Sequence, residues 1–85
     1  MAGQSGIINL KKKDQALLKQ FGEIVKSKRA ALNWTLEDTE DNGYPSWQHW
    51  QAVESGLKNI SFTTVMNVCR TLGIQPVDLF KKLKL

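Results

Sequence analysis

The chain has 85 residues, with 12 lysines and arginines, 8 aspartates and glutamates, and one cysteine. This length corresponds to one domain, the single cysteine excludes an internal disulfide, and no apolar run approaches the roughly 20 residues of a membrane-spanning helix. The net charge of +4 is uneven, because the window 37–41 holds four acids and no basic residue while the rest of the chain carries 12 positive and 4 negative charges.

A basic body of this kind suggests a polyanionic partner such as DNA, although a lysine-rich soluble surface explains the same charge. The first residues lack the apolar core of a signal peptide, and one cysteine fits a reducing compartment. We therefore expect a soluble, cytoplasmic protein. One histidine and one cysteine are too few for a structural zinc site, which commonly needs four ligands, so we expect no metal and no cofactor.

Residues 1–13 are polar and rich in small side chains, and we interpret them as a flexible basic arm ahead of a domain that spans 14–85. The arm ends in three lysines, Lys11, Lys12 and Lys13. Apolar residues then recur at helical spacing as far as Leu32. This periodicity predicts a first helix that ends at Asn33.

Thr35 and Asp38 form a capping-box pattern, a hydroxyl followed three residues later by a carboxylate. The pattern predicts a short second helix that runs over 36–42. Gly43 can adopt the left-handed conformation that stops such a helix.

Ser46 is a suitable N-cap for a third helix over 46–55, and Gly56 ends it. With about 100° of rotation per residue, Trp50 lies on one face of this helix and Gln48 and Gln51 lie on nearly the opposite face. The stretch therefore predicts a helix with a buried side and a side that carries amides.

Ser61 caps a fourth helix whose apolar positions continue to Leu72, and Pro76 opens a fifth at a position where proline is favoured. No segment alternates apolar and polar residues like a strand. The fold class that follows is all-α, a compact bundle of five short helices. The aromatic residues expected in its core are Trp34, Trp50, Phe62 and Phe80.

A helix, a short turn with glycine and a second helix form the outline of a helix-turn-helix. Three further strings sharpen this outline: ESGLKNISF at 54–62, LGI at 72–74 and LF at 79–80. With Arg29 in the first helix, they resemble the Cro and phage-repressor type of helix-turn-helix domain (XRE-like, with a lambda-repressor-like fold). The resemblance covers about residues 21–80.

The resemblance implies that the helix 46–55 enters the major groove of DNA with its N-terminal end first. The residues that would then face the bases are Trp47, Gln48, His49 and Gln51, and amide side chains are good readers of adenine. Phosphate contacts are expected from Lys58, Asn59, Ser46 and Thr35, and from the arm residues Lys11, Lys12 and Lys13. Some of these positions also have a plainer interpretation: Ser46 and Thr35 are helix caps, and His49 is a residue at the edge of the core. Glu54, at the end of the same helix, is expected to be a structural partner of Arg29.

The second helix departs from the family. Leu36 stands where a phosphate-contacting glutamine is usual, and the glycine comes one residue early, at Gly43. A shift of the register by one residue puts Thr39 and Gly43 at the small-residue positions of the family and demands an extra residue in the turn. We expect this shift and not a buried Glu40, because an unpaired buried charge is costly.

We therefore expect a sequence-specific DNA-binding transcriptional regulator, a repressor or controller, that binds an inverted repeat as a homodimer. The expected dimer surface is the apolar face of the last helix, made by Leu79, Phe80 and Leu83, although these residues can instead cover the monomer core. The alternative function is a helix-turn-helix scaffold reused as a protein-interaction module through the acidic helix 36–42. No pairing of a nucleophile with a base and no phosphate-binding loop favours an enzyme.

Overall fold

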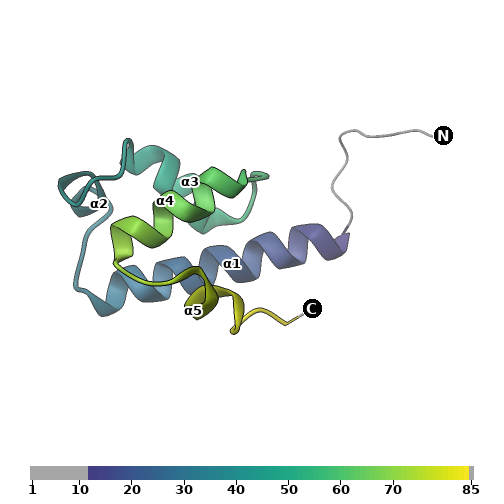
Figure 1. The fold of residues 1–85 in the computed structure, drawn as a ribbon. Coiled ribbons are helices and arrows are strands. Elements are labelled where there is room, and N and C mark those ends of the chain that lie inside the picture. Colours follow the sequence, from purple (N-terminus) through teal and green to yellow (C-terminus); the bar gives the residue numbers. More distant parts are fainter. Residues whose placement is uncertain (1–11, 85) are drawn as a thin grey trace.

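The computed structural model describes residues 12–84 and consists of helices and connecting loops, with no strand in that range. The prediction of an all-α fold with five helices is confirmed for this part of the chain (Figure 1). In chain order the helices are α1 (Lys12–Ala31), α2 (Asp38–Asp41), α3 (Trp47–Ser55), α4 (Phe62–Leu72) and α5 (Pro76–Phe80). None of these helices is both long and apolar enough to cross a bilayer.

The first helix begins earlier than the periodicity predicts. Lys12 and Lys13 belong to its first turn, whereas Lys11 and the remainder of the predicted arm lie outside the described residues. The helix ends at Ala31, and Asn33 follows in the left-handed region with φ of 61°. Asparagine tolerates this conformation better than most residues, which explains why the chain turns here.

Local capping signals set the bounds of the later helices. The Ser46 hydroxyl accepts the amide of His49 at the start of α3, and the Ser61 hydroxyl accepts the amide of Thr64 at the start of α4. Gly56 and Gly73 end the same two helices with φ of 69° and 72°. A left-handed residue at this position closes the last turn, and glycine adopts it without strain.

The second helix is shorter than predicted but has the predicted register. Its capping box forms in both directions, since the Asp38 carboxylate accepts the Thr35 amide at 2.7 Å and the Thr35 hydroxyl accepts the Asp38 amide at 3.2 Å. Thr39 is fully buried and donates its hydroxyl to the carbonyl of Leu36, while Glu40 is exposed. The shift by one residue is therefore confirmed.

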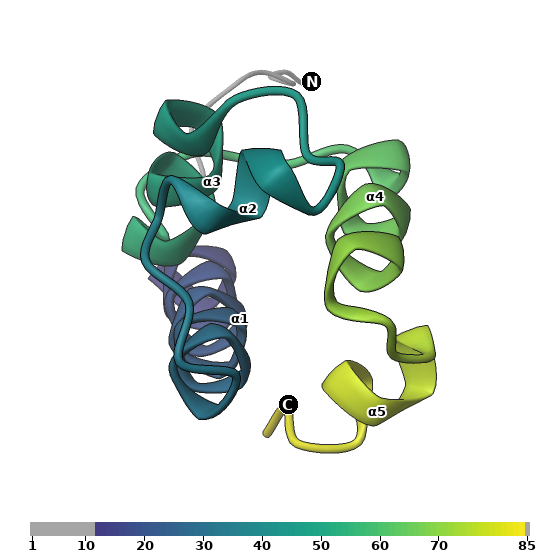
Figure 2. The same ribbon diagram turned by 90° about the vertical axis from the view of Figure 1, so that its left-hand side faces the viewer.

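The long helix α1 organises the bundle. It contacts α3, α4 and α5, and α2 contacts α3. Figure 2 shows α3 beside α1, α4 on the opposite side of the body, α2 between α3 and α4, and α5 below α4. The buried apolar residues that these helices enclose are Phe21, Val25, Tyr44, Trp50, Val53, Val68, Cys69, Leu72 and Leu79.

The helices α1 and α3 approach so closely that no side chain fits between them at two points. A Cβ added at Gly22 would lie 2.7 Å from the carbonyl oxygen of Val53, and one added at Gly56 would lie 2.9 Å from the amide nitrogen of Lys19. Both glycines are buried. They let the backbone of α3 rest directly on α1, which fixes the position of α3 in the bundle.

The prediction that four aromatic residues lie in the core is wrong for two of them, Phe62 and Phe80. Phe62 is 74% exposed and Phe80 is 44% exposed, whereas Trp50 is fully buried and Trp34 packs against the core while partly buried. Phe62 shares a face with Cys69 but is the first residue of α4, so the helix carries it past the end of the core. Periodicity identifies a face of a helix and not the point along the axis at which the core ends.

Candidate nucleic-acid interface

The third helix has the two-sided character that its sequence predicts. Trp50 and Val53 are buried against the core, and Gln48 and Gln51 are exposed on the other side. The Ser46 hydroxyl that caps the helix also contacts the amide oxygen of Gln48 at 3.2 Å. The structure therefore brings both predicted base-reading amides to one free surface.

A charged cluster anchors the buried side of α3 to α1. The Glu54 carboxylate accepts two hydrogen bonds from the Arg29 guanidinium, at 2.7 and 3.0 Å, and one from the Trp50 indole at 2.7 Å. Arg29 also donates to the carbonyl of Trp34. The hydrogen bonds to Glu54 raise the pKa of Arg29. The expected structural pairing of Glu54 with Arg29 is confirmed, and both side chains are fixed by it.

His49 lies at one edge of the exposed amide face and contacts a residue that precedes the helix. Its ring nitrogen Nδ1 is 2.8 Å from the hydroxyl of Tyr44, and the two rings stack with centroids 5.8 Å apart. Tyr44 is buried and packs edge-on against Trp50. Tyr44 was not among the sequence candidates, since its only signal there is its position just ahead of the helix cap.

Trp47 lies at the opposite edge of the amide face and is partly buried. Its backbone amide donates to the Glu40 carboxylate of α2 at 2.8 Å. A carboxylate at this position satisfies a free amide at the start of α3 and suits the helix dipole. With Asp38 in the capping box, two of the four clustered acids have structural roles, which sequence periodicity alone does not reveal.

The loop after α3 presents the predicted phosphate-contacting residues. Lys58 and Asn59 are exposed, although the Asn59 side chain also accepts the amide of Ile60. Beside this loop is a groove that α1 contributes to, lined by Lys12, Gln15, Ala16, Lys19, Gly56 and Leu57. Lys12 and Lys19 therefore lie beside the loop that carries Lys58, and Lys19 was not predicted to belong to the site.

The hydroxyls of Ser46 and Thr35 both serve as caps in the structure, as described above. Ser46 does so at the start of α3, and Thr35 lies just ahead of α2. A phosphate contact by either residue would be a second role.

The predicted dimer surface needs correction. Leu79 is completely buried in the single chain, and Leu83 packs partly buried against the core. Of the three predicted residues, only Phe80 is exposed, at 44%, and α5 exposes one further apolar residue, Val77, at 62%. Because the short helix α5 closes the bundle over α1 and α4, its Leu79 side is needed for the monomer core.

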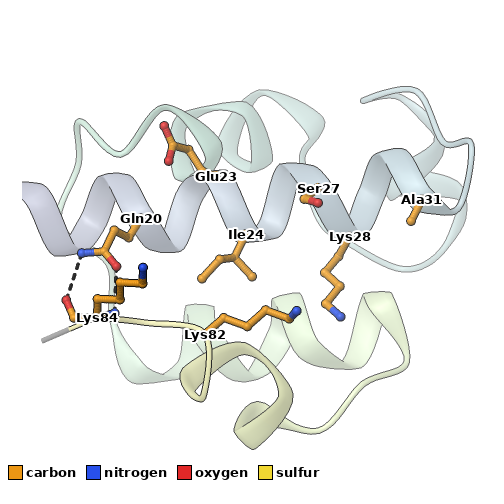
Figure 3. A pocket seen from close by; sticks show the side chains of 8 residues that line it. All are labelled: Gln20, Glu23, Ile24, Ser27, Lys28, Ala31, Lys82 and Lys84. Atoms are coloured by element: carbon orange, nitrogen blue, oxygen red, sulfur yellow. Dashed lines mark hydrogen bonds between the residues drawn. The ribbon is translucent and has the colours of Figure 1, made fainter.

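A second groove lies on the other face of α1, with a volume of about 390 Å³. Figure 3 shows Ile24 of α1 pointing toward the C-terminal segment that carries Lys82 and Lys84, and the Gln20 amide bonded to the backbone of Lys84. The α1 residues on this groove lie on roughly the opposite side of the helix from Gly22 and Arg29, which face α3. The two groups of lysines, beside α3 and on this groove, are therefore separated by the body of α1.

Within residues 12–84 no group of three histidine, cysteine, aspartate or glutamate side chains is arranged to hold a metal ion. Cys69 is buried, and burial, with a smaller effect of the nearby Asp78 carboxylate, raises the pKa of its thiol.

No family model, no curated protein and no solved structure matches the chain.

Proposed function

We propose that this protein is a sequence-specific regulator that binds double-stranded DNA and reads bases in the major groove with α3. The observation that carries the proposal is the exposed amide face of α3, formed by Gln48 and Gln51 opposite the buried Trp50. An α-helix fits the major groove. A glutamine amide can donate to N7 of adenine and accept from the N6 amino group of the same base.

The presentation of this face is rigid, which supports the proposal. Direct contact of α1 and α3 at Gly22 and the three hydrogen bonds to Glu54 hold the buried side of the helix. Base recognition needs side chains held to within a fraction of an ångström, and sites on packed helices achieve this better than sites on loops. The amides of α3 are thus placed on a fixed support.

The charges around α3 support the proposal in part. Lys58 lies in the loop that follows the helix, and Lys12 and Lys19 line the groove beside that loop, where these lysines can neutralise phosphates. Glu40 has the opposite effect at the start of α3, because its carboxylate repels a phosphate there. We therefore expect moderate affinity with a marked dependence on salt.

The proposal is tested by selecting binding sites from a random-sequence duplex library and measuring affinity at about 50 mM and about 200 mM salt. For Gln48→Ala we expect a loss of about 10-fold or more on the selected site and little change on random DNA, since a lost base contact costs ~1–3 kcal/mol. An equal loss on both kinds of DNA would show that Gln48 reads no base. Failure of the wild type to bind any duplex at low salt would refute the function.

The phosphate contact is tested with matched lysine variants. Lys58→Ala should lower the slope of log affinity against log salt by about one unit on all sequences. Lys82→Ala also removes one positive charge, but from the C-terminal segment that faces the other side of α1. This variant should leave the salt slope nearly unchanged. Equal slopes for the two variants would mean that the DNA does not lie against the α3 side.

We also propose a two-fold homodimer, because one such domain reads only a few base pairs and two copies reach major grooves about 34 Å apart. The exposed apolar residues Val77 and Phe80 support a contact through α5, next to the buried Leu79. This surface keeps Phe80 from the predicted one and exchanges Leu79 and Leu83 for Val77, and it implies an inverted repeat as the binding site.

The alternative is a protein-interaction module that uses the acidic window. Glu37, just before α2, and Asp41, its last residue, are exposed, while Asp38 and Glu40 serve as caps. Replacing Glu37 and Asp41 together with glutamine should strengthen DNA binding if α2 lies near the phosphate backbone. If the wild type binds no DNA, the same variant should instead lose a basic protein partner.

A further inference from the structure

The contact between Tyr44 and His49 decides which hydrogen-bonding group His49 presents to its surroundings. The Tyr44 hydroxyl and His49 Nδ1 are 2.8 Å apart, and the Tyr44 ring is held in the core by edge-on contact with Trp50. His49 itself is exposed on α3. The hydroxyl of a buried tyrosine therefore meets one ring nitrogen and leaves the other nitrogen, Nε2, for outside partners.

The direction of this hydrogen bond follows from the proton count. Burial raises the pKa of Tyr44, so the phenol keeps its proton at neutral pH. If His49 Nδ1 carried a proton and donated it, the Tyr44 proton would need a second acceptor, and no other hydrogen bond of this hydroxyl occurs among the described residues. A buried donor without an acceptor is costly. The arrangement that satisfies both groups has Tyr44 donating to an unprotonated Nδ1, which places the imidazole proton on Nε2.

We propose that Tyr44 is a positioning residue that holds neutral His49 in the Nε2–H tautomer, so that α3 presents a single fixed donor that recognises a guanine beside the bases read by Gln48. The preference for guanine follows from its major-groove edge, which has two adjacent acceptors, N7 and O6. Adenine places a donor at N6 next to its N7, and this donor would oppose the imidazole proton. The choice of base rests on the proposed DNA-binding function, whereas the tautomer does not.

The tautomer is tested in the free protein by ¹⁵N NMR of the imidazole ring at about pH 8, where an ordinary histidine is neutral. The chain has one histidine, so the assignment is unambiguous. The wild type should show one protonated nitrogen, Nε2, and a pyridine-like Nδ1. Tyr44→Phe keeps the aromatic ring and removes only the hydroxyl, and it should give averaged signals from both tautomers. A wild-type ring that is protonated on Nδ1, or identical spectra for the two proteins, would overturn the proposal.

The base is tested on a duplex that contains the selected site. Replacing each guanine in turn by 7-deazaguanine, which lacks the N7 acceptor, should weaken binding about fivefold to tenfold at one position. His49→Ala should weaken binding to the normal duplex by a similar factor and abolish the effect of the replacement. Tyr44→Phe should reduce the effect without changing the helical content. Sequence-specific binding that no 7-deazaguanine weakens would refute an imidazole contact to N7 of guanine and leave the proposed function standing. A fixed Nε2–H tautomer in a protein that binds no DNA would refute the function and leave the role of Tyr44 standing.

Discussion

Replacing Gly22 by alanine tests the close approach of α1 and α3, on which the position of the amide face depends. The added Cβ would lie 2.7 Å from the carbonyl oxygen of Val53 and 2.8 Å from the carbonyl carbon of Glu54. Ordinary contacts of this kind begin at about 3.4 Å, so the backbone of α3 must retreat by at least about 0.7 Å. A rigid backbone cannot yield as the end of a flexible side chain can.

The expected cost can be worked out from two opposing effects. Overpacking in a core costs typically ~1–3 kcal/mol, while alanine in place of glycine within a helix gains roughly 0.5–1 kcal/mol. The net loss for Gly22→Ala is therefore about 1–2 kcal/mol, which lowers Tm by about 5–15 °C in a domain of this size.

The measurement is urea unfolding followed by circular dichroism, with Ser27→Ala as the control. Ser27 is exposed on the opposite face of α1, and its replacement should change the unfolding free energy by less than about 0.5 kcal/mol. If Gly22→Ala were as stable as the wild type, or more stable, the helices would not be in direct contact. The direct packing that holds α3 rigidly on α1 would then be refuted.

Three further variants or conditions follow from the same packing. Glu54→Gln should lower the unfolding free energy by about 3 kcal/mol, because it leaves the Arg29 guanidinium without its carboxylate in a largely buried site; urea unfolding measures this, and a loss under about 1 kcal/mol would refute a structural role. Phe80→Glu should give a folded monomer in light scattering, with weaker binding to an inverted repeat but unchanged binding to a half-site, whereas a dimer that persists would exclude α5 as the contact surface. Above about pH 9 stability should fall as pH rises, because the raised pKa values of Tyr44 and Cys69 make the unfolded chain lose these protons first. Unfolding measured at about pH 8 and about pH 10.5 should show a smaller decrease for Tyr44→Phe than for the wild type.

The sequence by itself determined where α3 and α4 begin and end, because their capping signals are local. Ser46, Ser61 and Gly56 act on amides and carbonyls within a few residues of themselves, so their chemistry can be recognised without the fold. The buried side of α3 was also predictable, since Trp50 and Val53 recur at helical spacing. Thr39 was predicted inside and Glu40 outside for a different reason, because burying an unpaired carboxylate is costly.

The tertiary structure alone decided which apolar residues reach the core and what the polar ones contact. Phe62 and Leu79 both lie on apolar helix faces, yet one is exposed and the other is buried, because burial depends on where a neighbouring helix ends. Glu40 finds the amide of Trp47, and Tyr44 finds His49, only after α2 and the turn pack against α3. These contacts shape the edges of the proposed DNA-reading surface, and they join groups whose distance in space is set by helix packing and not by their spacing along the chain.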